Sequence, residues 1–286
     1  PKVAGRLGMR GIDVADPYIE RLMEGFAFLT SRVQMKMDAE FPRFSQRMLE
    51  MIAPNYLAPT PSMAIAEIQP DSSRGDLSKG FIVPRGTMMD SLALKKTGVT
   101  CSYTTAHEVN LLPLKIDKVE LGGVPADLPL AQLGLSQQGI NSALRIRIAC
   151  DGPQNLGHLD FDRLEFFLSG PDIEALKLLE LVMEHHVGIV CQTVSGQPQR
   201  QMLASDSLRQ EGFAPNQALL PDDLRNFDGY RLLQEYFAFP ARFRFISLSG
   251  LGKLIQRCES EKAFDMFILL DKTDEQLERV VDASHL

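Results

Sequence analysis

Apolar residues recur at helical spacing in the first part of the chain. The pair Asp16-Pro17 marks a helix start, because an aspartate caps the first N–H groups and a proline loses no useful N–H at the first helical position. We expect a helix from residue 16 to about 40, ended by Phe41-Pro42, and a shorter helix over 44–52. The apolar positions of the first helix are Tyr18, Ile19, Leu22, Met23, Phe26, Leu29, Val33 and Met37.

After a proline-rich connector, the spacing of apolar residues changes from helical to strand-like. Residues 1–61 are expected to form a helical segment, and residues 62–160 a β-rich domain. The cleanest alternation runs from Ala143 to Cys150 and predicts a half-buried strand, with Arg145 and Arg147 facing outward. Shorter strands are expected over 63–69, 81–83, 99–104 and 109–114, and a loop over 122–141.

The last part of the chain mixes helical and strand periods, which predicts an α/β domain over 161–286. The whole chain is therefore expected to have an α+β fold. One helix, Tyr230 to Phe239, carries an apolar cluster that we expect to be mainly internal core. The other expected elements are strands at 164–168, 187–194, 243–248 and 264–270, helices at 171–185, 250–258 and 274–281, and a polar loop at 195–206.

Composition and charge limit the class of protein. The 286 residues are 44% apolar with a net charge of −7, which excludes a wholly disordered chain and argues against nucleic-acid binding. No stretch approaches the roughly 20 apolar residues that span a bilayer, and the start lacks a signal peptide. We expect a fragment of a longer cytoplasmic chain that does not insert in a membrane.

The cysteine pattern does not indicate a metal site or a disulfide framework. Cys101, Cys150, Cys191 and Cys258 are widely separated and have apolar neighbours, so we expect small buried hydrophobic residues.

Candidate catalytic motifs are weak. Ser249 to Lys253 contains Gly-Leu-Gly-Lys but lacks the spacing of a phosphate-binding loop. His185-His186 point about a quarter-turn apart, His107-Glu108 lacks a second histidine, and Asp160 with Asp162 fits an exposed strand edge. We expect no catalytic residue, no metal and no cofactor.

The first helix has apolar residues on two sides. Phe28 and Met35 fall roughly opposite the stripe that contains Ile19, Phe26 and Val33. Burial against two different partners would explain this arrangement, and burial inside the chain's own core would explain it equally well. We take these five residues as candidates for a partner interface.

Several motifs along the chain resemble one known family. The sequence from Asp16 to Leu29, DPYIERLMEGFAFL, resembles the first helix of the TssF family (VasA or ImpG), which are baseplate subunits of the bacterial type VI secretion system. The other matches, in the family's order, are FPRF at 41–44, PNYLAPTPS at 54–62, GFIVPRG at 80–86, ALLP at 218–221 and GYRLLQEYFAFP at 229–240. Asn55 stands where the family commonly has a histidine.

The resemblance implies a structural protein. Family members form baseplate wedges with TssG around the VgrG spike hub, with TssE and TssK as further partners, and the wedges support assembly of the tube and sheath. It also implies a cytoplasmic place at the baseplate docked on the inner membrane of a Gram-negative bacterium. The first helix is then expected to join a bundle with TssG and a second TssF copy. The alternative is a cytoplasmic α/β enzyme whose site is completed by sequence outside this chain.

Overall fold

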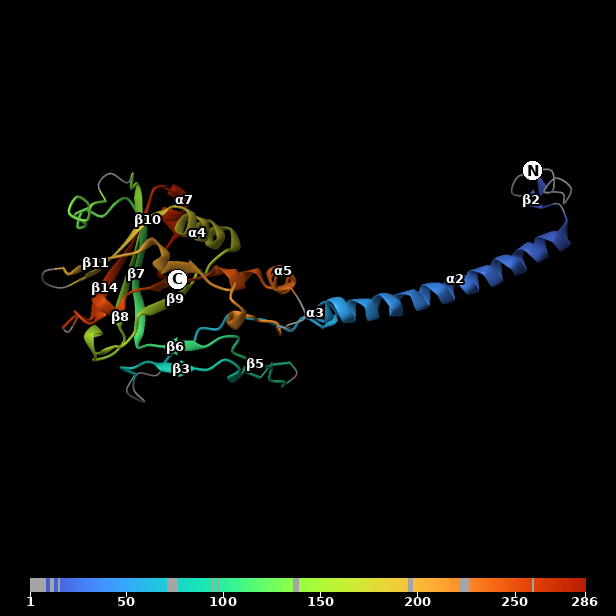
Figure 1. The fold of residues 1–286 in the computed structure, drawn as a ribbon, viewed down its shortest axis with the longest axis horizontal. Helices are drawn as coiled ribbons and strands as arrows, with labels where there is room; N and C mark the ends of the chain where they lie inside the picture. Colours follow the sequence, from blue (N-terminus) through green and yellow to red (C-terminus); the bar gives the residue numbers. More distant parts are fainter. Residues whose placement is uncertain are drawn as a thin grey trace. The chain divides into compact units, whose positions relative to one another are not determined.

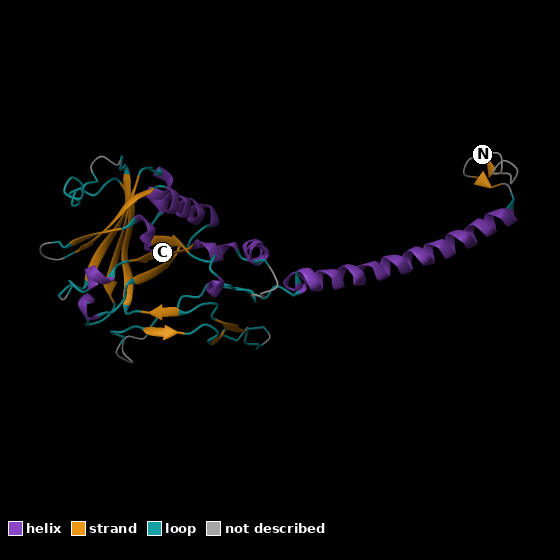
Figure 2. Cartoon of the chain, in the orientation of Figure 1, coloured by secondary structure: helices purple, strands orange, loops and turns teal. Residues whose placement is uncertain are grey.

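The computed structural model describes residues 9–10, 13–14, 16–70, 77–93, 95–96, 98–135, 139–194, 198–221, 227–258 and 260–286. The chain forms two compact units, the first built mainly from the chain up to Thr60 and the second starting at Pro61. Figures 1 and 2 show the helices and strands of each unit. The helices, the antiparallel sheets and their order along the chain confirm an α+β fold.

The first unit is dominated by one long helix, α2 (Pro17–Ile52). Its start is the predicted one: the Asp16 carboxylate accepts the N–H of Tyr18 at 2.9 Å. The short helix α3 (Pro54–Leu57) follows, and strands β1 (Met9–Arg10) and β2 (Asp13–Val14) pair before it.

The predicted stop of this helix at Phe41-Pro42 is wrong. The helix continues through Pro42 for ten more residues to Ile52, and Figure 1 draws it as one slightly curved ribbon. A proline inside a helix removes one N–H and crowds the carbonyl four residues earlier, which bends a helix without always ending it. The two helices expected at 16–40 and 44–52 are therefore one element.

A five-stranded antiparallel sheet forms the centre of the second unit, in the order β11-β10-β14-β8-β7. The strands are β7 (Leu114–Gly122), β8 (Ser142–Cys150), β10 (His186–Thr193), β11 (Arg200–Leu203) and β14 (Ala263–Leu270). Strands β7 and β8 come from the expected β-rich domain, and the other three come from the expected α/β domain. The structure thus places residues 61–222 and 228–286 in one compact unit, and the two domains that the sequence suggested over 62–160 and 161–286 contribute strands to the same sheet.

The predicted alternation of β8 is confirmed. Leu144, Ile146 and Ile148 are buried in the main core. Arg145 and Arg147 lie on the opposite face and both bind the buried Asp265 of β14, with N–O distances of 2.5 and 2.7 Å. Burial raises the pKa of Asp265, but the hydrogen bonds from the two arginines outweigh it and hold this pKa below its usual value.

Smaller sheets and helices complete the second unit. A three-stranded sheet has the order β12-β13-β9, and two-stranded pairs join β3 to β6 and β4 to β5. The strands are β3 (Phe81–Val83), β4 (Met88–Asp90), β5 (Ser102–Thr104), β6 (Val109–Leu111), β9 (Arg163–Phe167), β12 (Leu208–Gln210) and β13 (Phe245–Ser249). The helices are α4 (Asp172–Glu184), α5 (Asp228–Ala238), α6 (Gly252–Ile255) and α7 (Glu275–Val280), with 3-10 turns η1 (Leu156–His158), η2 (Ser205–Ser207), η3 (Pro215–Gln217), η4 (Pro240–Arg244) and η5 (Ala283–His285).

Several elements differ from the prediction. The structure assigns no strand to Met63–Gln69, all of which are described, although the residue pattern suggested one. Strand β7 was not expected, and β11 lies in what was expected to be a polar loop. The described part of 122–141 is irregular, as predicted, and two of its leucines, Leu128 and Leu135, cover part of the second face of the large sheet.

Candidate functional site: exposed apolar surfaces

Helix α2 exposes every apolar residue that the sequence analysis selected, except one. Phe26, Phe28, Val33 and Met35 are 60% to 72% exposed, while Ile19 is half-buried. No residue of α2 is buried, so within its own unit the helix packs into no core. The role of the two ridges as a partner interface remains a prediction.

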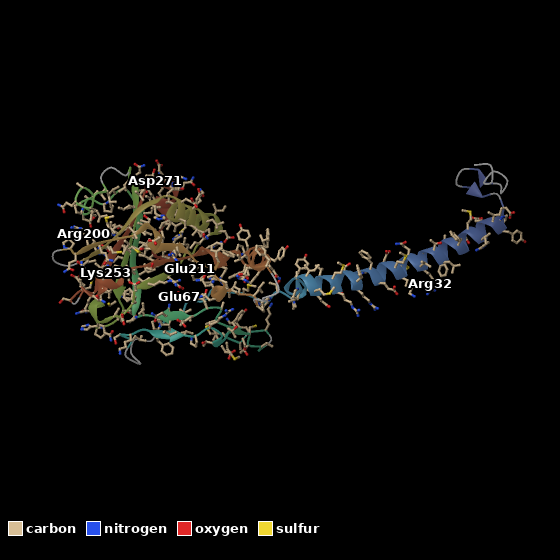
Figure 3. All side chains as sticks on the ribbon, viewed as in Figure 1. Arg32, Glu67, Arg200, Glu211, Lys253 and Asp271 are labelled. Carbon is tan, nitrogen blue, oxygen red and sulfur yellow. The ribbon has the colours of Figure 1, made fainter. Side chains whose placement is uncertain are left out.

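The two ridges lie on different sides of α2. At about 100° of rotation per residue, Phe28 and Met35 face away from Phe26 and Val33. The Arg32 guanidinium lies over the Phe28 ring at 5.8 Å from its centroid, and Figure 3 labels Arg32 on this helix. A solvated helix normally keeps its back polar, so a single partner would leave one of the ridges uncovered.

The main ridge continues beyond the predicted end of the helix. Because α2 passes Pro42 unbroken, four further exposed apolar residues extend the same side of the helix: Phe41, Phe44, Met48 and Met51. Helical rotation places Pro42 on the side of the helix away from this ridge. The exposed apolar stripe thus follows the whole length of α2, further than the sequence analysis expected.

A second apolar surface lies on α5, and here the prediction of internal core is wrong. The helix buries its charges and exposes its aromatic residues. Arg231 is 4% and Glu235 0% exposed, whereas Phe237 is 81% exposed. The exposed face of this helix consists of Tyr230, Leu233, Tyr236 and Phe237.

The buried charges of α5 satisfy the backbone of an irregular segment. Arg231 binds Glu235 at 3.0 Å, and the Glu235 carboxylate accepts the N–H groups of Leu219 and Leu220, both at 3.1 Å. This segment follows η3 and lies outside the sheets, so its amides need side-chain partners. Arg242 contributes in the same way by donating to the Gln217 carbonyl at 2.8 Å.

The sequence predicts the helical periodicity of α5, but it does not predict which side of the helix faces the core. Tyr230, Leu233 and Phe237 share one side of the helix, and Arg231 and Glu235 share the other. Such a pattern identifies an amphipathic helix, and the usual assumption then places the apolar side inward. The one available signal was the spacing of Arg231 and Glu235, which is that of an intrahelical ion pair.

The weak phosphate-loop motif has a structural role. The Asp162 carboxylate accepts the N–H groups of Gly250 and Gly252, at 3.2 and 2.8 Å. These are the amides that a phosphate would use, and a carboxylate already occupies them. The carboxylate of Asp162 thus caps this turn, while the N–H of Asp160 donates to the Ser78 carbonyl at 3.2 Å.

The histidines also have separate partners. The His185 ring contacts the Asp271 carboxylate at 2.9 Å, while the His186 ring contacts the Met183 carbonyl at 3.1 Å. His107 lies edge-on to Phe245, with ring centroids 6.2 Å apart. Burial, followed by the charge of Arg242, lowers the pKa of His107 below its usual value.

The cysteines are free thiols. Cys191 and Cys258 are buried as predicted, whereas Cys101 and Cys150 are half-buried. Burial raises the pKa of Cys191 to about 12, so this thiol stays protonated. Among the described residues, no three histidine, cysteine or acidic side chains gather in a way that could hold a metal ion.

No helix in the described part of the chain is both long enough and apolar enough to cross a membrane.

Comparison with known proteins identifies the family. The family profile described as "Type VI secretion system, TssF" matches residues 1–286. The type VI secretion system component TssF1 of Pseudomonas aeruginosa is 42% identical over 289 residues, which cover all of this chain and 46% of that protein. The chain thus spans less than half the length of this relative.

A solved structure has a similar fold. A chain of the type VI secretion system TssK-TssF-TssG baseplate subcomplex, determined by cryo-electron microscopy, matches with a TM-score of 0.61 and 24% identity. The match covers 89% of this chain and 44% of the other. The profile match over the whole length and the identity to TssF1 confirm the resemblance found in the sequence, and the chain belongs to the TssF family of the type VI secretion system.

Proposed function

We propose that the chain acts as a structural subunit of the type VI secretion baseplate. In this role it forms a wedge with TssG around the VgrG spike hub and supports assembly of the inner tube and the sheath. Membership of the TssF family supports this proposal, as does the fold shared with a chain of the TssK-TssF-TssG subcomplex.

The exposed stripe of α2 is the observation that carries the proposal. The helix has 36 residues, none of them buried, and would extend about 54 Å at 1.5 Å per residue. Monomeric proteins rarely expose contiguous apolar patches above a few hundred Å², and larger ones mark interaction sites. A helix with apolar ridges on two sides fits a multi-helix bundle, in which two neighbours cover the two ridges.

The partners follow from this geometry and from the family. We propose that TssG and a second copy of TssF cover the two ridges of α2, with Ile19, Phe26 and Val33 on one contact and Phe28 and Met35 on the other. TssK, TssE and the VgrG hub are the further partners proposed for the assembled baseplate. The protein works in the cytoplasm, at the baseplate docked on the inner membrane, and carries out no catalysis.

The substitution Phe28→Asp tests the bundle. It replaces an aromatic ring of the proposed contact with a carboxylate, and burial of such a charge is unfavourable even with Arg32 one turn away on the same helix. We expect the variant to lose co-purification with TssG, while the second unit unfolds at the wild-type temperature because Phe28 makes no contact with a core. Ala27→Asp is the matched control, since the exposed Ala27 lies between the two ridges, about 100° around the helix from Phe28, and should keep wild-type yield of the complex.

If Phe28→Asp and Ala27→Asp both co-purify with TssG at wild-type yield, the Phe28 ridge is not an interface and the proposed bundle is wrong.

A further inference from the structure

The second unit carries an aromatic surface that is separate from α2. On α5, Tyr230, Leu233, Tyr236 and Phe237 are all exposed. At about 100° of rotation per residue, these four side chains share one side of the helix. Large apolar side chains that gather on one exposed helix face mark an interaction site.

Ring contacts join this side of α5 to a phenylalanine outside the helix. The centroid of the Tyr236 ring lies 5.5 Å from that of Phe237 and 5.8 Å from that of the buried Phe243. The Phe243 ring in turn contacts the exposed Phe213, with centroids 5.2 Å apart. We call this surface the aromatic face, and it consists of Phe213, Tyr230, Leu233, Tyr236 and Phe237.

Buried hydrogen bonds fix the position of the aromatic face. Glu235 binds Arg231 on the inner side of α5 and accepts two backbone N–H groups of the neighbouring segment, which sets the rotation of the helix. Before Phe213, the Gly212 backbone has a φ of 106°, and its N–H donates to Oε1 of Gln217 at 2.7 Å. Preorganised aromatic side chains lose little entropy on binding and are frequent hot spots of interfaces.

The charges around the aromatic face favour a cationic partner. Helix α5 contains one basic residue, Arg231, which is buried, whereas the side chain of Asp228 in its first turn is 47% exposed. In the part of the chain that the structure describes, no arginine or lysine lies over the rings of Phe213, Tyr236 or Phe237. The faces of aromatic rings carry negative charge and attract cations, so this surface is apolar and electrostatically negative.

Arginine covers aromatic rings elsewhere in the second unit. The Arg145 guanidinium lies 5.3 Å from the ring centroid of Phe267, which is buried, and that of Arg242 lies 5.6 Å from the half-buried Phe245. In both cases a guanidinium from the same chain shields a ring from solvent. The rings of the aromatic face have the same chemistry without such a cover from this chain.

We infer that the aromatic face binds a helix of a partner protein that presents arginine and leucine side chains along one side. The guanidinium groups stack on the Tyr236 and Phe237 rings, while the leucines pack against Leu233 and Phe213. From Tyr230 to Phe237 the face extends about 10 Å along α5, or two helical turns, which matches the packing of one helix ridge against another.

The aromatic face of a second copy is a poor partner, because it presents no cation and would bring the two Asp228 carboxylates together. This binding surface goes beyond the proposed function and depends neither on α2 nor on TssG.

The size of the aromatic face indicates a transient contact. Its four rings are partly exposed and would each bury on the order of 100 Å², which gives about 400 Å² on this side of the interface. Interfaces that bury less than about 1,200 Å² in total are typical of weak, short-lived complexes. We therefore expect rapid exchange between the free and bound states.

A pair of synthetic peptides tests this inference. The first is a helical peptide of about 16 residues with leucine and arginine along one side, and the second carries citrulline, the neutral analogue of the same shape, at each arginine. We would titrate the labelled peptides with the 286-residue chain and measure fluorescence anisotropy. The arginine peptide should bind at least about fivefold more tightly than the citrulline peptide.

Substitutions in the chain locate the binding site. Phe237→Ala should weaken binding of the arginine peptide at least about fivefold, and its melting temperature shows whether the variant is folded. Ile173→Ala is the matched control, since Ile173 is an apolar residue on α4 that is 72% exposed, and it should bind as the wild type does.

The double variant Tyr236→Leu with Phe237→Leu keeps the surface apolar but removes two rings. Its preference for the arginine peptide over the citrulline peptide should fall below about twofold, because the stacking positions are gone.

Three results would overturn the inference. The first is no binding of the arginine peptide to the wild-type chain, and the second is equal binding of the two peptides. The third is wild-type affinity in Phe237→Ala. Binding of anionic phospholipid vesicles that requires Phe237, without binding of the arginine peptide, would also overturn it and assign the aromatic face to a lipid surface.

Co-purification with TssG tests the proposed function separately. If the chain binds TssG but not the arginine peptide, this inference fails and the structural role stands. If the peptide binds at the aromatic face and TssG does not co-purify, the proposed function fails and the inference stands.

Discussion

Helices α2 and α4 have the same kind of amphipathic pattern, but the apolar residues of α4 are buried and those of α2 are not. In α4, Ala175, Leu178, Leu181 and Val182 are buried in the core of the second unit. In α2, whose apolar residues are larger and more numerous, none is buried. A hydrophobic stripe thus indicates that one face of a helix is covered, but it does not indicate whether the same chain or another molecule covers that face. For α2 we propose that other chains do so.

Helix α5 shows a third arrangement, and a substitution in it should have the largest effect on the free energy of unfolding. Its inward side is charged, so removing Glu235 leaves the buried Arg231 with only a longer contact to Asp228 at 3.9 Å. Glu235→Ala should lower the free energy of unfolding by about 3–5 kcal/mol, because Arg231 and two backbone N–H groups lose their partner. Chemical denaturation followed by circular dichroism measures this change.

Glu275→Ala is the control for Glu235→Ala, since Glu275 forms an exposed ion pair on α7 and should change stability by less than about 0.5 kcal/mol. Equal effects of the two substitutions would show that the buried pair of α5 is not structural.

The comparison of α2 with α4 can be tested by one substitution in each helix. Leu178→Ala removes a side chain that is 1% exposed and should cost about 2–5 kcal/mol. Leu29→Ala removes one that is 63% exposed and should change the stability of the isolated chain by less than about 0.5 kcal/mol. A large loss from Leu29→Ala in the isolated chain would mean that α2 is covered by the chain itself.

Acid should destabilise the second unit through His107. The pKa of His107 is lowered from 6.5 by burial and by Arg242, so below pH 6.5 the unfolded chain takes up a proton before the folded chain does. The stability is therefore complete above pH 6.5 and is lost as the pH falls toward the folded-state pKa. Burial raises the pKa of Glu165 and gives a slope of opposite sign at lower pH.

We expect His107→Gln to flatten the fall in melting temperature below pH 6.5, and His158→Gln, at an exposed position, to leave the wild-type curve unchanged. Because Glu165 lies 3.8 Å from the His107 ring, the difference between the curves of the two variants reports the titration of His107 together with its contact to Glu165. A His107→Gln curve parallel to the wild-type curve would contradict the role assigned to His107.

The smallest stability effect is expected at the aromatic face of α5. Because Phe237 is 81% exposed, Phe237→Ala should change the melting temperature by about 1–2 °C at most, equivalent to a few tenths of a kcal/mol. A phenylalanine buried in the core, as the apolar cluster predicted for this helix, would instead cost roughly 3–5 kcal/mol. A calorimetric scan of the variant decides between these values, and a loss of several kcal/mol would restore the core assignment.

The sequence predicted those elements whose signals are local. Asp16 and Pro17 define the start of α2, and the alternation of Leu144, Ile146 and Ile148 defines β8. The sequence pattern did not predict β7, which turn residues follow closely. It predicted that α2 ends at Pro42, because the energetic cost of a proline inside a helix does not show whether the helix continues into the next turn.

The remaining errors depend on tertiary contacts. The orientation of α5 depends on backbone amides at Leu219 and Leu220, which periodicity within the helix does not report. Likewise, the pairing of β8 with β14 joins residues more than a hundred positions apart, so the sequence suggested two domains where the structure has one compact unit. The family motifs, by contrast, identified the family correctly without any of these contacts.

Hydrogen–deuterium exchange of α2, with and without TssG, tests most directly whether this helix is an interface. In the chain alone, the amides of α2 should exchange faster than those of α4, because no packing protects them. In the complex with TssG, protection should extend along α2 on both sides of Pro42 while α4 remains as slow as before. If TssG binds and exchange in α2 does not change, the exposed stripe is not the surface that assembles the wedge.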